Sequence, residues 1–297
     1  MTVALLRKFL DVEKARDYLA LAKMRVMSLV IFTSLAGIIL APGSISHLKA
    51  CVAILCIAMG SGAAGAINMW YDRDIDAIMA RTQNRPIVTG KISAEEALHF
   101  GVLLSCISVI AMALFVSIVP SLLLLLTILW YVFVYTMWLK RSTMQNIVIG
   151  GAAGAFPPMI GWAAVTGDVS LASLSLFLII FFWTPPHFWA LAMNQSEDYK
   201  ACNIPMMPVV MGDDYTKKQI VIYAVLTVIA SIIPVFLGLS SIAYASLASL
   251  LGSVFLYYAI ALLPDANNLL APRLFFFSII YLFLIFSLMI IDHYLKR

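Results

Sequence analysis

The feature that most constrains this chain is a succession of nine apolar stretches, each about as long as a membrane-spanning helix. A helix needs about 20 largely apolar residues to cross the hydrocarbon core of a bilayer. Only 11% of the 297 residues are charged, whereas a soluble protein carries roughly a quarter. We therefore predict an all-α, polytopic membrane protein with nine transmembrane helices, at approximately residues 25–41, 50–70, 97–118, 120–138, 146–166, 171–193, 220–238, 241–263 and 274–293.

The basic residues predict how these helices are oriented. With nine spans, every Lys and Arg except Lys49, Lys296 and Arg297 falls on the same side as the N-terminus. Positive charge accumulates on the cytoplasmic side of membrane proteins, so the N-terminus is expected in the cytoplasm and the C-terminus outside. The charged residues 1–23 are expected to form an extramembrane segment on the cytoplasmic side.

An acidic segment follows the second apolar stretch, at Asn68-Met-Trp-Tyr-Asp72-Arg-Asp74-Ile-Asp76. On a continuous helix Asn68, Asp72 and Asp76 share a face, because residues four apart differ by about 40° of rotation, and Asp74 points elsewhere. Two carboxylates on one face repel unless a cation lies between them, and Mg²⁺ takes one or two carboxylates plus phosphate oxygens. The alternative is a solvated helix end balanced by arginines. Because ionisable groups at membrane depth are costly, we predict a site for Mg²⁺ and a diphosphate.

A second segment of this kind, Asn194-Gln-Ser-Glu197-Asp198, follows the sixth stretch. Asn194 and Asp198 repeat the spacing of Asn68 and Asp72 four spans later, and therefore on the same side. We predict one domain over residues 1–297 with two parallel four-helix repeats, residues 24–138 and 146–263, and a last helix at 274–293. The acidic ends would face each other across a cavity, which makes Asn194 and Asp198 further candidate metal ligands.

Basic side chains expected at the same level would neutralise phosphate oxygens that a metal does not reach. Each one alone is better explained as a topology determinant, but as a set they favour a polyanionic substrate. They are Lys23, Arg25, Arg81, Arg85, Lys140, Arg141 and Lys200.

These residues resemble the UbiA superfamily of intramembrane prenyltransferases. Asn68-xxx-Asp72-xxx-Asp76 followed by Arg81-Thr-x-x-Arg85-Pro86 looks like its first signature. The resemblance covers nearly the whole chain, and departs from many members at Asn194, where they have Asp. Longer strings are similar to the members that farnesylate haem: Lys23-x-Arg25-Val-Met-Ser, Tyr135-Thr-Met-Trp-Leu-Lys140-Arg141, Pro157-Pro158-Met-Ile-Gly-Trp162, Trp183-Thr-Pro-Pro-His187-Phe-Trp189 and Asn203-Ile-Pro-Met-Met-Pro.

The resemblance implies a reaction and roles for the residues. Farnesyl diphosphate would give its farnesyl group to the 2-vinyl carbon of haem b, forming a hydroxyethylfarnesyl side chain and diphosphate, with Mg²⁺ as cofactor. The implied catalytic residues are Asn68, Asp72, Asp76, Lys140 and Asp198, and the implied haem contacts are His187, Trp183 and Trp189. For His187 the alternative is a buried neutral histidine bonded to a carbonyl.

The same resemblance implies a location and partners. In a bacterium the chain would lie in the inner (plasma) membrane, with its active site on the cytoplasmic side. A haem A synthase or a terminal oxidase is a candidate partner, beside the lipid bilayer and the two substrates, and no nucleic-acid partner is expected.

Two other functions stay open at this stage. A related enzyme could use the same diphosphate site and prenylate an aromatic acid, a quinone precursor or another tetrapyrrole. An ion-coupled secondary transporter also places acidic groups in a repeated helical bundle. Against the transporter, the acids are expected at the cytoplasmic edge rather than at the midplane.

Overall fold

The chain is helical throughout the part that its computed structural model describes, which is residues 12–296 apart from the side chains of residues 12, 13 and 24–26. No β-strand occurs among these residues. The helices are α2 (Val12–Leu21), α3 (Met24–Leu40), α4 (His47–Tyr71), α5 (Arg73–Ile78), α6 (Ala94–Phe115), α7 (Ile118–Leu129), η1 (Trp130–Leu139), α8 (Lys140–Ser142), α9 (Asn146–Gly150), α10 (Ala152–Thr166), α11 (Leu171–Met193), α12 (Ser196–Ala201), α13 (Met207–Phe236), α14 (Ile242–Ala261) and α15 (Ala271–Leu295).

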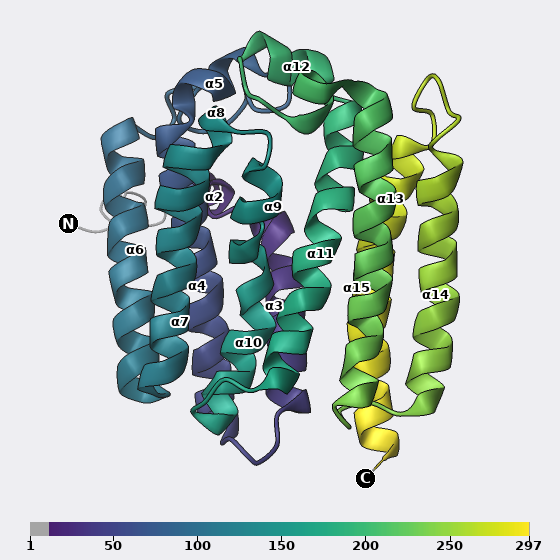
Figure 1. The fold of residues 1–297 in the computed structure, drawn as a ribbon. Helices are drawn as coiled ribbons and strands as arrows, with labels where there is room; N and C mark the ends of the chain where they lie inside the picture. Colours follow the sequence, from purple (N-terminus) through teal and green to yellow (C-terminus); the bar gives the residue numbers. More distant parts are fainter. Residues whose placement is uncertain (1–11, 297) are drawn as a thin grey trace, which may run out of the picture.

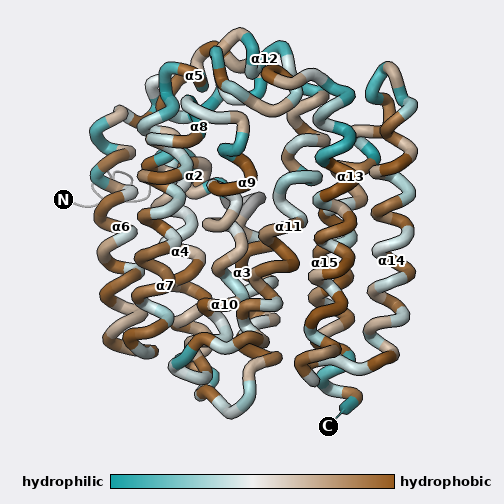
Figure 2. The backbone as a smooth tube through the Cα atoms, viewed as in Figure 1, coloured by the Kyte–Doolittle hydropathy of each residue, from teal (hydrophilic) through white to brown (hydrophobic). Residues whose placement is uncertain are grey.

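The long helices stand side by side as a bundle (Figure 1). Large apolar side chains face outward, such as Leu103 at 61% exposure, Leu114 at 73% and Phe236 at 85%. Hydrophilic residues collect at the two ends, while hydrophobic residues cover the length between them (Figure 2). An apolar belt with polar ends is what a lipid environment requires, so the predicted all-α, multi-pass membrane fold is confirmed.

The helix count agrees with the prediction except at the first span. In the described residues, eight helical segments are long and apolar enough to cross a membrane. The first predicted span corresponds to α3, whose 17 residues make it shorter than the others. The number nine therefore stays a prediction.

The start of α13 differs from the sequence prediction, which placed the beginning of that span at residue 220. The helical segment begins at Met207 and is interrupted at Gly212, which has φ 77° and ψ 170°. The charged residues after Gly212 look like a loop in the sequence. However, Lys217 is only 2% exposed and donates a hydrogen bond to the Asp265 carbonyl oxygen at 2.7 Å, which anchors the α14–α15 connection.

Close helix packing at the centre of the bundle depends on two glycines. A Cβ at Gly37 in α3 would lie 2.0 Å from the Pro158 carbonyl oxygen of α10, and a Cβ at Gly161 in α10 would lie 2.2 Å from the Ser34 oxygen of α3. Only glycine allows the two backbones to approach this closely in lipid. The α3–α10 contact joins the first half of the chain to the second.

The short helices α5, α8 and α12 gather at one end of the bundle, opposite the C-terminus (Figure 1). Each acidic segment is part of a long helix followed by a short one, α4 with α5 and α11 with α12. The Cys202 thiol, just after α12, lies 3.6 Å from the Ile75 carbonyl oxygen of α5. The two acidic segments thus lie at the same end, as a parallel repeat requires, while the repeat boundaries stay a prediction.

Candidate active site

The first acidic segment keeps its helical repeat where α4 gives way to α5. The Asp72 amide donates to the Asn68 carbonyl at 2.9 Å, and the Asp76 amide donates to the Asp72 carbonyl at 2.8 Å. The i to i+4 spacing therefore survives the joint, and Asn68, Asp72 and Asp76 are 3%, 0% and 2% exposed. The side chain of Asp74 is 60% exposed. As predicted, Asn68, Asp72 and Asp76 point inward and Asp74 points away from them.

Asn68 is the centre of a buried hydrogen-bond network. Its amide nitrogen donates to Asp72 Oδ2 at 2.7 Å and to Thr136 Oγ1 at 3.2 Å, and its oxygen accepts from Lys23 Nζ at 2.6 Å. Lys23 lies just before α3 and adopts a left-handed backbone conformation, with φ 53° and ψ 47°. The network therefore joins three separate parts of the chain: Lys23 precedes α3, Asn68 belongs to α4 and Thr136 belongs to η1.

Cations surround the buried carboxylates. Lys140 forms an ion pair with Asp72 and Arg85 forms one with Asp76. Arg141 donates two hydrogen bonds of 2.7 Å to Asp74 and lies 3.6 Å from Asp72 Oδ1. The bonds from Arg141 lower the pKa of Asp74 to about 2.

The cluster carries more positive than negative charge. Asp72, Asp74 and Asp76 face four cations, namely Lys23, Arg85, Lys140 and Arg141. Burial, followed by the charges of Arg85 and Lys140, lowers the pKa of Lys23 to about 7, although Asp72 and Asp76 oppose this shift. Crowded cations of this kind favour a polyanion.

One carboxylate oxygen is left without a hydrogen bond. Asp72 Oδ1 is buried and accepts none from the described residues. Arg141 lies 3.6 Å from it, in an ion pair but beyond hydrogen-bonding distance. A buried anionic oxygen that accepts no hydrogen bond is costly, so a cation or donor bound at this oxygen would stabilise it. A bound metal would satisfy it, although the described residues contain no ready group of three His, Cys, Asp or Glu side chains.

The second acidic segment is arranged differently from the first. The chain tightens after α11, because the Asn194 and Gln195 amides donate to carbonyls three residues back, at Leu191 and Ala192. Asn194 is exposed and its side chain donates to the Ala190 carbonyl at 3.0 Å, at the end of its own helix. Asp198 is partly buried, and no described residue makes a hydrogen bond or ion pair with its carboxylate. Asn194 and Asp198 therefore do not share a helix face.

The other predicted basic residues are spread more widely. Arg81 is exposed and interacts with Tyr199 of α12. Lys200 is exposed and lines a surface groove with Glu197, Asp213 and Asp214. The side chain of Arg25 lies outside the described residues.

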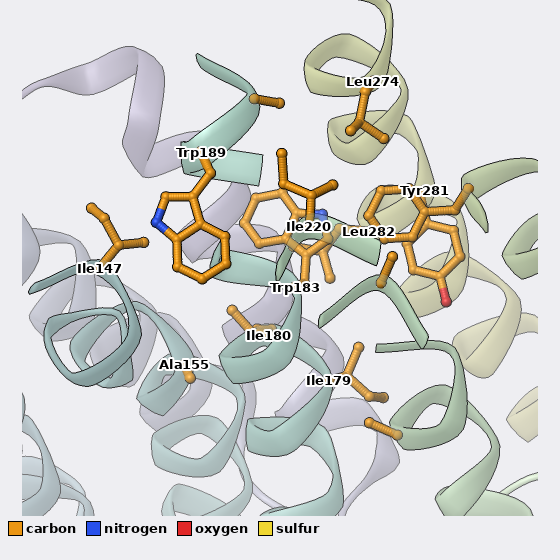
Figure 3. Close-up of a cluster of buried hydrophobic side chains, with 14 of the residues drawn as sticks. Ile147, Ala155, Ile179, Ile180, Trp183, Trp189, Ile220, Leu274, Tyr281 and Leu282 are labelled. Carbon is orange, nitrogen blue, oxygen red and sulfur yellow. The ribbon is translucent and has the colours of Figure 1, made fainter. Parts of the chain in front are cut away.

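The aromatic residues predicted to contact haem pack inside the bundle, on α11. Trp183 and Trp189 are 6% and 0% exposed, in a cluster with Ile179, Ile180 and Ile220 (Figure 3). The indole nitrogen of Trp189 is buried without a hydrogen-bond partner among the described atoms. His187 is 8% exposed, and its Nδ1 lies 2.7 Å from Ser278 Oγ of α15. Its ring also interacts with the backbone of Phe275, as the alternative of a buried histidine bonded to a carbonyl predicts.

The sequence prediction placed a span at residues 120–138, but it missed the contact made by Thr136 and the conformation of the helix that carries it. η1 is a ten-residue π-helix, a rare conformation that often occurs at functional sites. Thr136 of this helix contacts Asn68, and electrostatic interactions link Tyr131 of the same helix to Asp72 and Asp76. The only feature of the sequence that could have indicated this role is the position of the Thr136 hydroxyl, four residues before Lys140.

Comparison with known proteins gives this site a context. The profile of the UbiA prenyltransferase family matches residues 30–285. A protein named protoheme IX farnesyltransferase from Rickettsia bellii is 59% identical over 275 residues, covering 92% of each chain. Another of that name, from Sinorhizobium fredii, is 58% identical, covering 94% of this chain and 89% of its own.

Solved structures share the fold at much lower identity. A digeranylgeranylglyceryl phosphate synthase superposes with a TM-score of 0.79 at 21% identity, covering 95% of this chain and 99% of its own. A UbiA homologue from Archaeoglobus fulgidus, bound to DMAPP and Mg²⁺, gives 0.70 at 20% identity, covering 92% and 99%. The fold and these matches define a membrane-embedded prenyltransferase. The chain belongs to the UbiA prenyltransferase family.

Proposed function

We propose that this enzyme transfers the farnesyl group of farnesyl diphosphate to the 2-vinyl group of haem b, giving haem O and diphosphate. The observation that supports this most strongly is the 59% identity, over 92% of the chain, to a relative named for that activity. The site is chemically suited to the reaction, because a diphosphate leaving group needs a preorganised positive environment. A transporter does not need such a buried, cation-rich cluster.

The diphosphate binds at the buried cluster described above. Lys23, Arg85, Lys140 and Arg141 supply positive charge around it, and Arg81, Arg25 and Lys200 are the further candidates from the sequence. Lys140 and Arg85 occupy the carboxylates in the structure. When these cations turn to phosphate oxygens, they meet the charge that develops as the allylic carbon–oxygen bond breaks.

Mg²⁺ is the proposed cofactor, held by Asn68, Asp72 and Asp76, with Asp198 as the acid from the second segment. The unsatisfied Asp72 Oδ1 fits this role, because it is a hard oxygen ligand of the kind that Mg²⁺ prefers. The Asn194 side chain, bonded to its own helix, would have to turn to take part. When bound, the metal neutralises charge on the departing diphosphate.

The acceptor lies against α11 in this proposal, with His187, Trp183 and Trp189 as its contacts. All three are in or beside an apolar cluster that shields a reactive allylic cation from bulk water. The unpartnered Trp189 indole N–H is a donor for a polar group of the acceptor.

The cellular setting follows from the topology prediction. The protein lies in a bacterial inner membrane with its N-terminus in the cytoplasm and its C-terminus outside. The end of the bundle that carries α5, α8 and α12 then faces the cytoplasm. A haem A synthase or a terminal oxidase takes up the product.

The test uses purified protein in lipid with farnesyl diphosphate, Mg²⁺ and one acceptor at a time. We expect haem b to be converted to a heavier, later-eluting haem, identified by mass, and 4-hydroxybenzoate to remain unchanged. If the aromatic acid is prenylated and haem b is not, the acceptor assignment is wrong. Release of diphosphate, followed separately, reports whether the donor reacts at all.

A further inference from the structure

His187 lies in a stack of aromatic rings that covers most of its imidazole. Trp183 covers one face, with ring centroids 4.3 Å apart and an angle of 17°. Phe275 of α15 stacks on it as well, at 4.5 Å and 22°, and Phe188 meets it edge-on at 5.1 Å and 86°. The residual exposure of His187 is 8%. This residual exposure leaves room for a small molecule such as water to reach the ring.

Ser278 determines which nitrogen of this ring carries the proton. Ser278 Oγ lies 2.6 Å from the Phe275 carbonyl oxygen, and two oxygens approach so closely only with a hydrogen between them. A serine hydroxyl has one hydrogen, which is therefore used. The 2.7 Å contact from Oγ to His187 Nδ1 needs a second hydrogen, which must belong to Nδ1. His187 is thus the Nδ1–H tautomer, with a lone pair on Nε2.

The surroundings hold this arrangement in place. Ser278 is 0% exposed, and its carbonyl accepts a hydrogen bond from Trp183 Nε1 at 2.7 Å. The same serine therefore fixes both the histidine and the ring that covers it. No described residue donates a hydrogen bond to His187 Nε2, so its lone pair is available to a ligand.

The proposed reaction needs a base at one defined step. The farnesyl C1–oxygen bond breaks with its electron pair on diphosphate, and the vinyl π electrons form the new carbon–carbon bond. The adjacent carbon of the former vinyl group is then cationic. A water molecule adds its oxygen there and must lose one proton to give the hydroxyl group of the product.

We propose that His187 Nε2 is the general base that takes this proton, and that Ser278 is the positioning residue that keeps Nε2 unprotonated. This inference rests on the proposed farnesylation of haem. In this proposal, water is added at the contact between α11 and α15, and the diphosphate leaves from the Asn68–Asp76 cluster. General bases contribute about 10²–10⁴-fold to a rate.

The experiment measures products of the purified full-length enzyme with haem b, farnesyl diphosphate and Mg²⁺. For His187→Ala we expect formation of the hydroxylated product to fall by about 100-fold or more. The remaining prenylated haem should shift toward a species that lacks one water, because the cation then loses a carbon-bound proton instead. Added imidazole should partly restore hydroxylation.

Ser278→Ala tests the positioning role, and Ser278→Thr, which keeps a hydroxyl, should restore most of the rate. The ¹⁵N signals of His187 should show a protonated Nδ1 in the wild type and a mixture of tautomers in Ser278→Ala. Ser175→Ala is the matched control, because Ser175 is a buried serine whose hydroxyl also donates to a carbonyl three residues back, at 2.6 Å. Its products should be those of the wild type.

The possible failures can be told apart. If His187→Ala alters the haem absorption spectrum but leaves the share of hydroxylated product unchanged, His187 is an iron ligand and the inference is wrong. An Nε2-protonated His187 in the wild type also contradicts it. If the wild type makes no prenylated haem, the proposed function itself fails. If it makes haem O and only the His187 prediction fails, the proposed function stands.

Discussion

Three aspartates within five positions illustrate how strongly local surroundings determine the role of a residue. Asp72 and Asp76 are buried and paired with Lys140 and Arg85, whereas the Asp74 side chain is 60% exposed and bonded to Arg141. The sequence predicts this division from helical rotation alone. It does not predict which cation meets which carboxylate, because the partners lie up to 68 residues away along the chain.

These aspartates give a matched test of the diphosphate site. We expect Asp72→Asn and Asp76→Asn to lower kcat/KM for farnesyl diphosphate by about 100-fold or more, since each removes a charge that helps hold the metal and leaving group. Asp74→Asn should change it by less than about fivefold, because an exposed ion pair is worth at most about 1 kcal/mol. Steady-state kinetics decide this, and equal losses in all three variants would refute the assignment.

Asn194 shows where the residue-level prediction fails. Its spacing to Asp198 equals that of Asn68 to Asp72, but the spacing matters only on a continuous helix. The hydrogen bonds after Met193 run to carbonyls three residues back, so α11 ends there and the Asn194 side chain bonds to its own helix. No residue type in Asn194-Gln195-Ser196 marks that stop clearly, which is why the sequence alone suggests a symmetrical pair.

At the scale of elements, the positions of most long helices follow from apolar length, but the internal geometry of η1 does not. Trp130–Leu139 has the composition of an ordinary apolar helix. Its π conformation is accompanied by tertiary contacts, including the Asn68 bond to Thr136 and the close approach of Gly150 to Tyr135. Such tertiary contacts are absent from a one-dimensional pattern.

A substitution in η1 tests whether this helix supports the site. Thr136→Val keeps the shape but removes the acceptor for the Asn68 amide, which leaves a buried N–H without that partner, at a cost of about 1–3 kcal/mol. We expect kcat/KM for farnesyl diphosphate to fall about fivefold or more. Thr136→Ser retains the hydroxyl and should remain within about twofold of the wild type. Identical kinetics for Val and Ser would show that the bond has no role in the site.

A second element-scale prediction concerns the end of the bundle opposite the site. Asp292 of α15 is 7% exposed and accepts hydrogen bonds from the Ser241 amide, at 2.7 Å, and from the Ser241 hydroxyl at the start of α14. Asp292→Ala leaves these donors unpaired and should lower the free energy of unfolding by about 1–3 kcal/mol. Thermal unfolding in detergent measures this, and kcat should change little. An unchanged midpoint would contradict the prediction.

For the whole molecule, the contact between α3 and α10 is one of the closest that join the two halves of the chain. Gly161→Ala places a Cβ 2.2 Å from the Ser34 carbonyl oxygen, so the helices must separate. We expect this to lower the free energy of unfolding by about 1–3 kcal/mol. Gly154→Ala, in the same helix, meets no atom within 4 Å and should be neutral or slightly stabilising. Unfolding midpoints of the two variants compare them directly. Equal midpoints would mean that the contact is not required.

The whole-molecule fold was predictable because a membrane leaves few alternatives. A chain in lipid can satisfy its backbone only as helices or as a closed barrel, and continuous apolar stretches of about 20 residues favour helices over the alternating strands of a barrel. The packing order of those helices depends instead on particular contacts, such as Gly37 on Pro158, which hydropathy does not reveal. The geometry of the site cannot be predicted from hydropathy either, since Lys23, Asn68 and Lys140 meet only once the bundle is assembled.

The most direct test of this account is transfer of labelled farnesyl to haem b by the purified protein as free Mg²⁺ is varied from full chelation to millimolar levels. The account predicts no labelled haem under chelation and a rate that rises and saturates as Mg²⁺ is restored. No labelled haem at any Mg²⁺ concentration, or transfer that chelation leaves unchanged, would contradict it.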